Sequence, residues 1–156
     1  MVIAFVGHSK LINETNIKDA VKREIANNIS TIEPVLCYLG GYGDFDYISA
    51  VSCKELKETY SNIEAVYVTP YLDLNSQAKI KEMQKEGLCD SSIYPLSEKT
   101  LPRFAISKRN EWMVKNADLI IAYVAYGRGG AAKTLAMAKR KNKRIINIYS
   151  EENIKE

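Results

Sequence analysis

The stretch ADLIIAYVAYGRGGAAKT, residues 117–134, runs from an apolar segment into three glycines and then into a lysine and a threonine. Glycines directly after a buried strand let backbone N–H groups approach a ligand, and a helix that starts there presents its positive dipole end. A phosphate or another anionic group is the natural partner of such a turn. We therefore treat Gly127, Gly129, Gly130 and Thr134 as candidate ligand-binding residues.

Two known motifs come close to this stretch, and neither is complete. The P-loop pattern GxxxxGK[ST] fails because Ala132 replaces its last glycine and because the one apolar segment that follows carries no aspartate for magnesium. The dinucleotide pattern GxGxxA fits, with Glu151 placed to bind a ribose, but 156 residues leave little room for a dehydrogenase's nicotinamide and substrate sites. Both patterns hold a phosphate at a glycine-rich helix start, and that shared feature is our prediction.

Two more glycine-bearing turns follow apolar segments. One ends the segment VIAFVG (2–7), and the other is LGGYGDFD (39–46). A single histidine is often structural, but His8 lies directly where a ligand is expected. The candidate ligand contacts in these two turns are Gly7, His8, Ser9, Gly40, Gly41, Gly43, Asp44 and Phe45.

Two carboxylates stand at the start of the helix predicted after the second turn. Asp44 suits a helix cap, because acidic side chains favour the positive end of a helix. Asp46 is the stronger functional candidate, because a carboxylate at this edge can bind ribose hydroxyls or act at a glycosidic bond. We therefore name Asp46 as a candidate catalytic residue.

The elements that must position these residues alternate along the chain. We expect strands at 2–7, 35–41, 64–71, 117–124 and 144–150, and helices at 13–29, 45–60, 103–117 and 131–143. Apolar strands separated by helices predict an α/β fold: a Rossmann-like, doubly wound, mainly parallel five-stranded sheet with helices on both faces. Such a sheet binds ligands at the carboxyl ends of its strands where the strand order reverses, so the three glycine turns should meet there.

One segment breaks this alternation. Residues 72–101 contain a polar surface helix (NSQAKIKEMQKEG) and a loop (LCDSSIYPLSEKTLP), and act either as a lid-like insertion or as a solvated excursion. Otherwise we expect a single domain spanning residues 1–156. The helix that follows the segment brings Arg103 to the ligand edge, roughly 9 Å closer along the helix axis than Arg109.

The composition bears on partners, metals and compartment. The net charge of +3, from 22 basic and 19 acidic residues, argues against a nucleic acid partner. Three scattered cysteines and one histidine indicate neither a disulfide framework nor a zinc site, and we expect no metal and no cofactor. The start MVIAFVGHSK is too short for a signal peptide or a membrane span, so we expect a cytoplasmic protein without a membrane partner.

Four blocks of residues carry a family resemblance. They are FVGH, GGYGDFDYISA, RNEWMVKNADLIIAY and GRGGAAKTLAMA, in this order. The chain resembles the SLOG superfamily, named for the Smf/DprA proteins and the Lonely Guy enzymes, and within it the YpsA-like branch of small single-domain proteins. The resemblance covers residues 2–149, and the most specific block is the one that contains Arg109 and Asn110.

The resemblance implies a Rossmann-like fold, a site for nucleotides or nucleotide-derived ligands, and a homodimer or larger assembly. Lonely Guy enzymes are phosphoribohydrolases that cleave the N-glycosidic bond of nucleoside monophosphates. Arg109 matches an arginine of their site, and Gly129 and Gly130 match part of their glycine run. Their catalytic glutamate has no counterpart, because Lys133 and Thr134 stand near its place. Arg109 is accordingly a candidate catalytic residue, and Asn110 a candidate ligand contact.

Three functions follow as alternatives. The first is a sensor or sequestering module that binds a phosphorylated nucleotide or nucleotide-derived ligand, with Arg103 or Arg109 neutralising charge. The second is a hydrolase or transferase acting on the N-glycosidic bond of nucleoside monophosphates, with Asp46 beside the anomeric carbon. The third is a protein associated with nucleic acid, as DprA-type members are. A regulatory protein whose ligand site has decayed is a weaker alternative.

Overall fold

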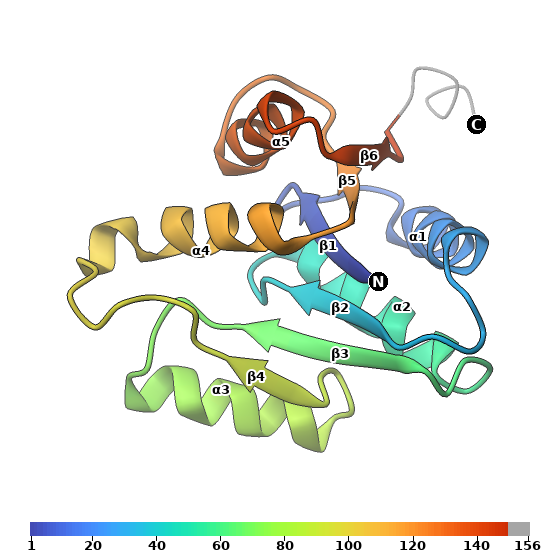
Figure 1. Cartoon of the computed structure of the whole chain (residues 1–156), viewed down its shortest axis with the longest axis horizontal. Helices are drawn as coiled ribbons and strands as arrows, with labels where there is room; N and C mark the ends of the chain where they lie inside the picture. Colours follow the sequence, from blue (N-terminus) through green and yellow to red (C-terminus); the bar gives the residue numbers. More distant parts are fainter. Residues whose placement is uncertain (150–156) are drawn as a thin grey trace.

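The computed structural model describes residues 1–149 and arranges them as one six-stranded, all-parallel sheet with helices on both sides (Figure 1). The predicted Rossmann-like α/β class is confirmed, although the sheet has six strands rather than five. Glu151, the acid of the dinucleotide pattern, lies outside the described residues, as does the last residue of the predicted strand 144–150.

The element bounds lie close to the predicted ones. The strands are β1 (Val2–Gly7), β2 (Val35–Leu39), β3 (Ile63–Val68), β4 (Ser91–Ile93), β5 (Leu119–Tyr123) and β6 (Arg144–Asn147). The helices are α1 (Glu14–Asn28), α2 (Asp44–Leu56), α3 (Leu74–Lys85), α4 (Pro102–Asn116) and α5 (Gly130–Arg140). Most of the larger differences are at the C-terminal ends of elements: α2 ends at Leu56 rather than at 60, and β3 ends at Val68 rather than at 71.

The strand order explains where a ligand site can form. The sheet runs β4-β3-β2-β1-β5-β6, so the chain first moves outward from β1 to β4. Helix α4 then carries it back across the sheet to β5, on the other side of β1 (Figure 1). The connections that leave β1 and β5 therefore diverge at their carboxyl ends, and this reversal of strand order opens a crevice there.

The sixth strand lies within the segment 72–101 that we predicted to be a helix and a loop. The helix is present as α3, but part of the predicted loop is β4, which pairs in parallel with β3 through Ser91 and Ile93. Three residues, two of them serines, are too few to show strand periodicity. The preceding Asp90 fixes the approach, because its Oδ2 accepts the backbone N–H of Ala65 at 2.8 Å.

The four central strands β1, β2, β3 and β5 are largely buried on both faces, which explains why they are mostly apolar. Along β1, Ile3 and Phe5 pack into the core under α1 and α2, while Ala4 and Val6 pack into the core under α4 and α5. Within residues 1–149, no helix combines the length and apolar character needed to cross a bilayer. The three cysteines are buried and free.

Candidate functional site

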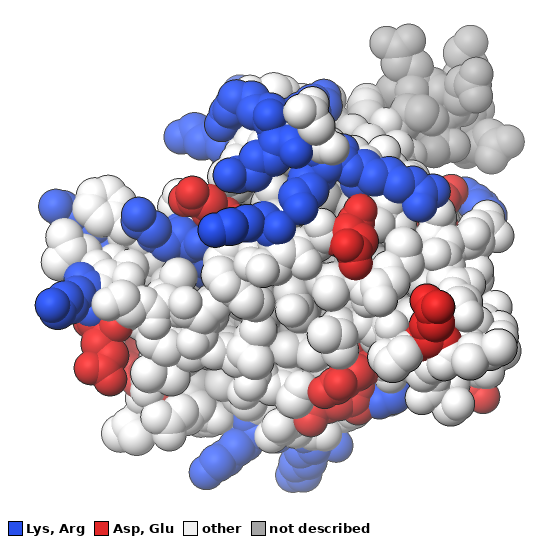
Figure 2. Space-filling model, in the orientation of Figure 1, with Lys and Arg blue, Asp and Glu red and all other residues white. Residues whose placement is uncertain are grey.

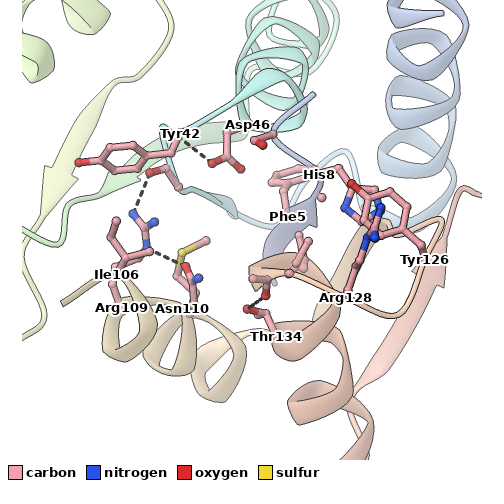
Figure 3. A pocket seen from close by; sticks show the side chains of 18 residues that line it. Phe5, His8, Tyr42, Asp46, Ile106, Arg109, Asn110, Tyr126, Arg128 and Thr134 are labelled. Carbon is pink, nitrogen blue, oxygen red and sulfur yellow. Dashed lines mark hydrogen bonds between the residues drawn. The ribbon is translucent and has the colours of Figure 1, made fainter. Parts of the chain in front are cut away.

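A cavity of about 520 Å³ opens at the carboxyl ends of β1, β2 and β5, between α4 and α5 (Figure 3). The turn after each of these three strands contributes to its wall. The structure thus brings together residues that are up to 129 positions apart in the sequence, from Phe5 to Thr134. The predicted site residues that line this cavity are Gly7, His8, Ser9, Gly40, Asp46, Arg109, Asn110, Gly129, Gly130 and Thr134.

Six predicted site residues are not among those lining the cavity: Gly41, Gly43, Asp44, Phe45, Arg103 and Gly127. Phe45 is fully buried in the core. The Oδ2 atom of Asp44 accepts the backbone N–H of Leu11 at 2.9 Å, so this carboxylate holds the turn after β1. Arg103 is exposed on α4, with its guanidinium carbon 4.8 Å from the centre of the Phe104 ring.

The first two glycine turns are packed against the protein itself. A Cβ atom added at Gly7 would lie 2.2 Å from the Phe45 ring, and one added at Gly41 would lie 2.1 Å from the Tyr67 ring. At Gly40 the added atom would lie 2.8 Å from Oδ2 of Asp46. These glycines are needed by the fold, because any side chain would overlap neighbouring protein atoms.

The third glycine turn is open. A Cβ atom added at Gly127, Gly129 or Gly130 would meet nothing within 4 Å. Only Gly129, with φ of 90°, has a backbone conformation that side chains disfavour. Neither packing nor backbone conformation therefore requires glycine at positions 127 and 130. For Gly130, which lines the cavity, the approach of a ligand remains as a reason for its small size.

The start of α5 presents unpaired donors to the cavity. No side chain caps this helix, and the N–H groups of Gly130, Ala131 and Ala132 have no hydrogen-bond partner among the described residues. Arg128 lines the same end of the cavity. The Thr134 hydroxyl donates to the Gly130 carbonyl at 2.8 Å. Backbone donors, a helix dipole and a cation together favour an anion at this end.

An aromatic stack forms the wall beside this anion end (Figure 3). The rings of His8 and Tyr126 are parallel, with centres 3.9 Å apart, and the Arg128 guanidinium carbon lies 5.4 Å from the Tyr126 ring centre. The Nε2 atom of His8 accepts the Ala125 N–H at 2.9 Å. Burial lowers the pKa of His8, which favours the neutral ring that can accept this bond.

The opposite wall is organised by Arg109. This side chain is 2% exposed, and its Nη1 donates to the carbonyls of Gly40 at 2.7 Å and Val68 at 2.6 Å. Its Nε donates to Oδ1 of Asn110 at 2.9 Å. The Arg109 guanidinium therefore links α4 to the ends of β2 and β3, and it also fixes the side-chain amide of Asn110, which lines the cavity.

Asp46 stands close to this cation, at the start of α2. Its Oδ2 accepts the Tyr42 N–H at 2.8 Å. Burial raises the pKa of Asp46 to about 6, against the opposing effects of the Tyr42 N–H and of the charges on Arg109 and Lys79. Lys79 itself donates to the Gly41 carbonyl and lies 3.9 Å from the centre of the Tyr42 ring. Asp46 thus carries a carboxyl that changes charge near neutral pH.

Eight residues of the cavity wall were not among the candidate site residues: Phe5, Val6, Tyr42, Ile106, Met113, Tyr126, Arg128 and Ala131. Tyr42, Tyr126 and Arg128 lie inside the glycine turns, and their position alone was a signal. Ile106 and Met113 lie on α4, and nothing in their spacing distinguishes a cavity wall from a core. Within residues 1–149, no three side chains of the His, Cys, Asp or Glu type gather as they would around a metal ion.

Comparison with known proteins finds similarity among solved structures alone. No family model matches the sequence, and neither does any curated protein. Among solved structures, the fold is similar to that of DNA processing protein A from Helicobacter pylori, with a TM-score of 0.64 and 16% sequence identity. The similarity covers 98% of this chain and 67% of the other, and that protein is described for its single-stranded DNA binding mode.

This similarity corrects one prediction. From the small net charge we argued against a nucleic acid partner. The fold of DNA processing protein A, however, matches 98% of this chain, and that protein binds single-stranded DNA. Net charge sums over the whole surface and is insensitive to how charges are distributed on it. The charge balance therefore does not exclude nucleic acid.

The packed and the open glycine turns predict different effects of an added methyl group on stability. Gly7→Ala should lower the free energy of unfolding by about 1–3 kcal/mol, because its Cβ overlaps the Phe45 ring. Gly127→Ala, which meets open space, should change it by less than about 0.5 kcal/mol. Urea unfolding followed by circular dichroism measures both, and equal losses would contradict the distinction.

The carboxyl of Asp46 predicts a pH-dependent stability. Its pKa is raised from 3.8 to about 6 in the folded protein, so ionisation opposes folding increasingly from about pH 4 upward. Asp46→Asn should therefore stabilise the protein at pH 7.5, by about 1–3 kcal/mol, and much less at pH 4.5. Paired urea titrations at the two pH values measure this. A gain that is the same at both values would show that the carboxyl is not perturbed.

Proposed function

We propose that the cavity binds a phosphorylated nucleotide or a nucleotide-derived ligand, with a phosphate at the start of α5. The observation that carries this proposal is the open glycine turn. Gly129 and Gly130 leave room for close approach, and the first amides of α5 have no other partner among the described residues. Arg128 adds a positive charge at the same end. Phosphate is the common biological anion that suits such a site.

The rest of the cavity suits the organic part of a nucleotide. A volume of about 520 Å³ is within the range of small-molecule sites. Tyr126 is 51% exposed at the cavity wall and offers an aromatic surface near the phosphate end. Bases stack on such side chains, as they do in many nucleotide sites.

We also propose that the chain belongs to the YpsA-like branch of the SLOG superfamily. The block that carries the resemblance most specifically runs from Arg109 to Val114 and on through residues 117–122, and its residues Arg109, Asn110 and Met113 line the cavity. Sites of nucleotide-derived ligands are what this resemblance implies, so it agrees with the function proposed from geometry.

Binding is testable by calorimetry with the 5′-mono- and 5′-diphosphates of the four ribonucleosides. We expect at least one to bind, and Gly130→Asp to abolish binding, because its carboxylate would occupy the phosphate position and repel it. The matched control is Ala136→Asp, which adds the same charge to an exposed part of α5 outside the cavity. Absence of binding across the panel, or equal loss in both variants, would overturn the proposal.

The same incubations test cleavage of the N-glycosidic bond. The Asp46 carboxylate lines the cavity and is the group that this reaction would require. Chromatography should show either intact nucleotide, which supports a binding module, or free base that is absent with Asp46→Asn, which supports a hydrolase.

A second candidate function is binding of a single-stranded nucleic acid, and the distribution of charge favours it. Figure 2 shows basic side chains gathered over α5 and β6. Residues 119–149 contain seven basic residues and no acidic residue. The rest of the chain contains 15 basic and 19 acidic residues, so its net charge is negative. None of the ion pairs within residues 1–149 involves this region. Its seven basic residues are Arg128, Lys133, Lys139, Arg140, Lys141, Lys143 and Arg144.

Titration of fluorescent single strands at several salt concentrations tests this candidate. If the basic surface contacts phosphates, Lys139→Gln with Arg140→Gln should weaken binding about tenfold and reduce the salt slope by about 1.4. Lys81→Gln with Lys85→Gln on α3 removes the same charge from exposed positions elsewhere and should leave the slope unchanged. Similar slopes for both double variants would argue against this surface.

A further inference from the structure

The two ends of the cavity differ in the kind of polar group they offer. The end at the start of α5 has N–H donors and the cation of Arg128. The wall opposite has a carboxylate, Asp46, and the guanidinium of Arg109, and the amide of Asn110 lies on α4 between that wall and Thr134 (Figure 3). A donor-only end suits an anion, whereas donors mixed with a carboxylate suit a neutral group that both donates and accepts.

One carboxylate oxygen of Asp46 remains free for a ligand. Its Oδ2 is used by the Tyr42 N–H, whereas Oδ1 has no hydrogen-bond partner in the part of the chain that the structure describes. Asp46 lines the cavity, and Gly40 beside it leaves the carboxylate the space that it occupies. An acceptor in this position can take a hydrogen from a bound hydroxyl, and its negative charge repels a second phosphate.

The amide of Asn110 is oriented by Arg109. A guanidinium has donors only, so the Asn110 atom that faces its Nε at 2.9 Å must be the carbonyl oxygen. The NH₂ group of Asn110 is therefore the free end, and it has no hydrogen-bond partner among residues 1–149. Because Arg109 is itself held by the carbonyls of Gly40 and Val68, this donor is fixed before a ligand arrives.

We infer that Asp46 and Asn110 bind the vicinal hydroxyls of a ribose, and hence that the ligand is a ribonucleotide rather than a 2′-deoxynucleotide. Each hydroxyl can donate to the Asp46 carboxylate or accept from the Asn110 amide, which uses both free groups at once. Arg109 acts as a positioning residue, through Asn110. The inference rests on the proposed phosphate site at the start of α5, which supplies the other end of the same ligand.

The test compares each ribonucleoside 5′-monophosphate with its 2′-deoxy counterpart by calorimetry. The wild-type protein should prefer the ribonucleotide by about tenfold or more, because one hydrogen bond to a charged group is lost with the hydroxyl. Asp46→Asn and Asn110→Leu should each reduce this preference to less than about threefold. Glu82→Gln, which removes an exposed carboxylate of α3, is the control and should retain the full preference.

The outcomes separate this inference from the function on which it rests. If neither series binds, the phosphate site itself is wrong. If both series bind the wild-type protein equally, or if the preference survives in both cavity variants, the nucleotide site stands and the ribose assignment is overturned. Thermal melting of each variant identifies any that fail to fold, and the wild-type comparison needs no variant.

Discussion

The buried guanidinium of Arg109 is the interaction on which the cavity depends. It bonds to the carbonyls of Gly40 and Val68, which lie at the ends of two neighbouring strands, and it does so from a helix that crosses the sheet on its way to β5. No carboxylate lies within salt-bridge distance of it in the described part of the chain. Carbonyl dipoles and the nearby charge of Asp46 compensate it instead. The strand ends, α4 and the far wall of the cavity are therefore fixed by one side chain, and the cavity exists before any ligand enters it.

Several features of the cavity have a cost in stability that the fold does not require. The start of α5 lacks a side-chain cap, Asp46 carries a carboxyl whose ionisation opposes folding, and Gly130 occupies open space. Each could be replaced by a residue better suited to the isolated protein. Unsatisfied donors, a perturbed carboxyl and an unneeded glycine in one cavity are the kind of local inconsistency expected at a binding site.

The order of strands and helices could be predicted because apolar strands and amphipathic helices alternate clearly, and because parallel strands must meet a ligand at one edge. The short strand β4 could not, since its three residues have no distinguishable pattern. Glycine spacing located the turns, but it did not separate Gly41, which is packed against Tyr67, from Gly130, which faces open space. That difference depends on neighbours remote in sequence. The prediction likewise favoured Arg103 over Arg109, because it used only their positions along the helix axis. Which face of α4 turns toward the sheet cannot be read from those positions.

The charges of this small protein are unevenly distributed, so that one side of its surface is positive and the remainder is not. The side formed by α5 and β6 is positive although the rest of the chain carries more acidic than basic residues. A polyanion diffusing toward the molecule would be turned so that it meets that side first, at a distance of about one Debye length, before any specific contact forms. The cavity mouth lies beside the same helix, at its first turn. Charge outside the pocket would therefore set how often anionic molecules reach it, independently of how tightly the pocket then holds them.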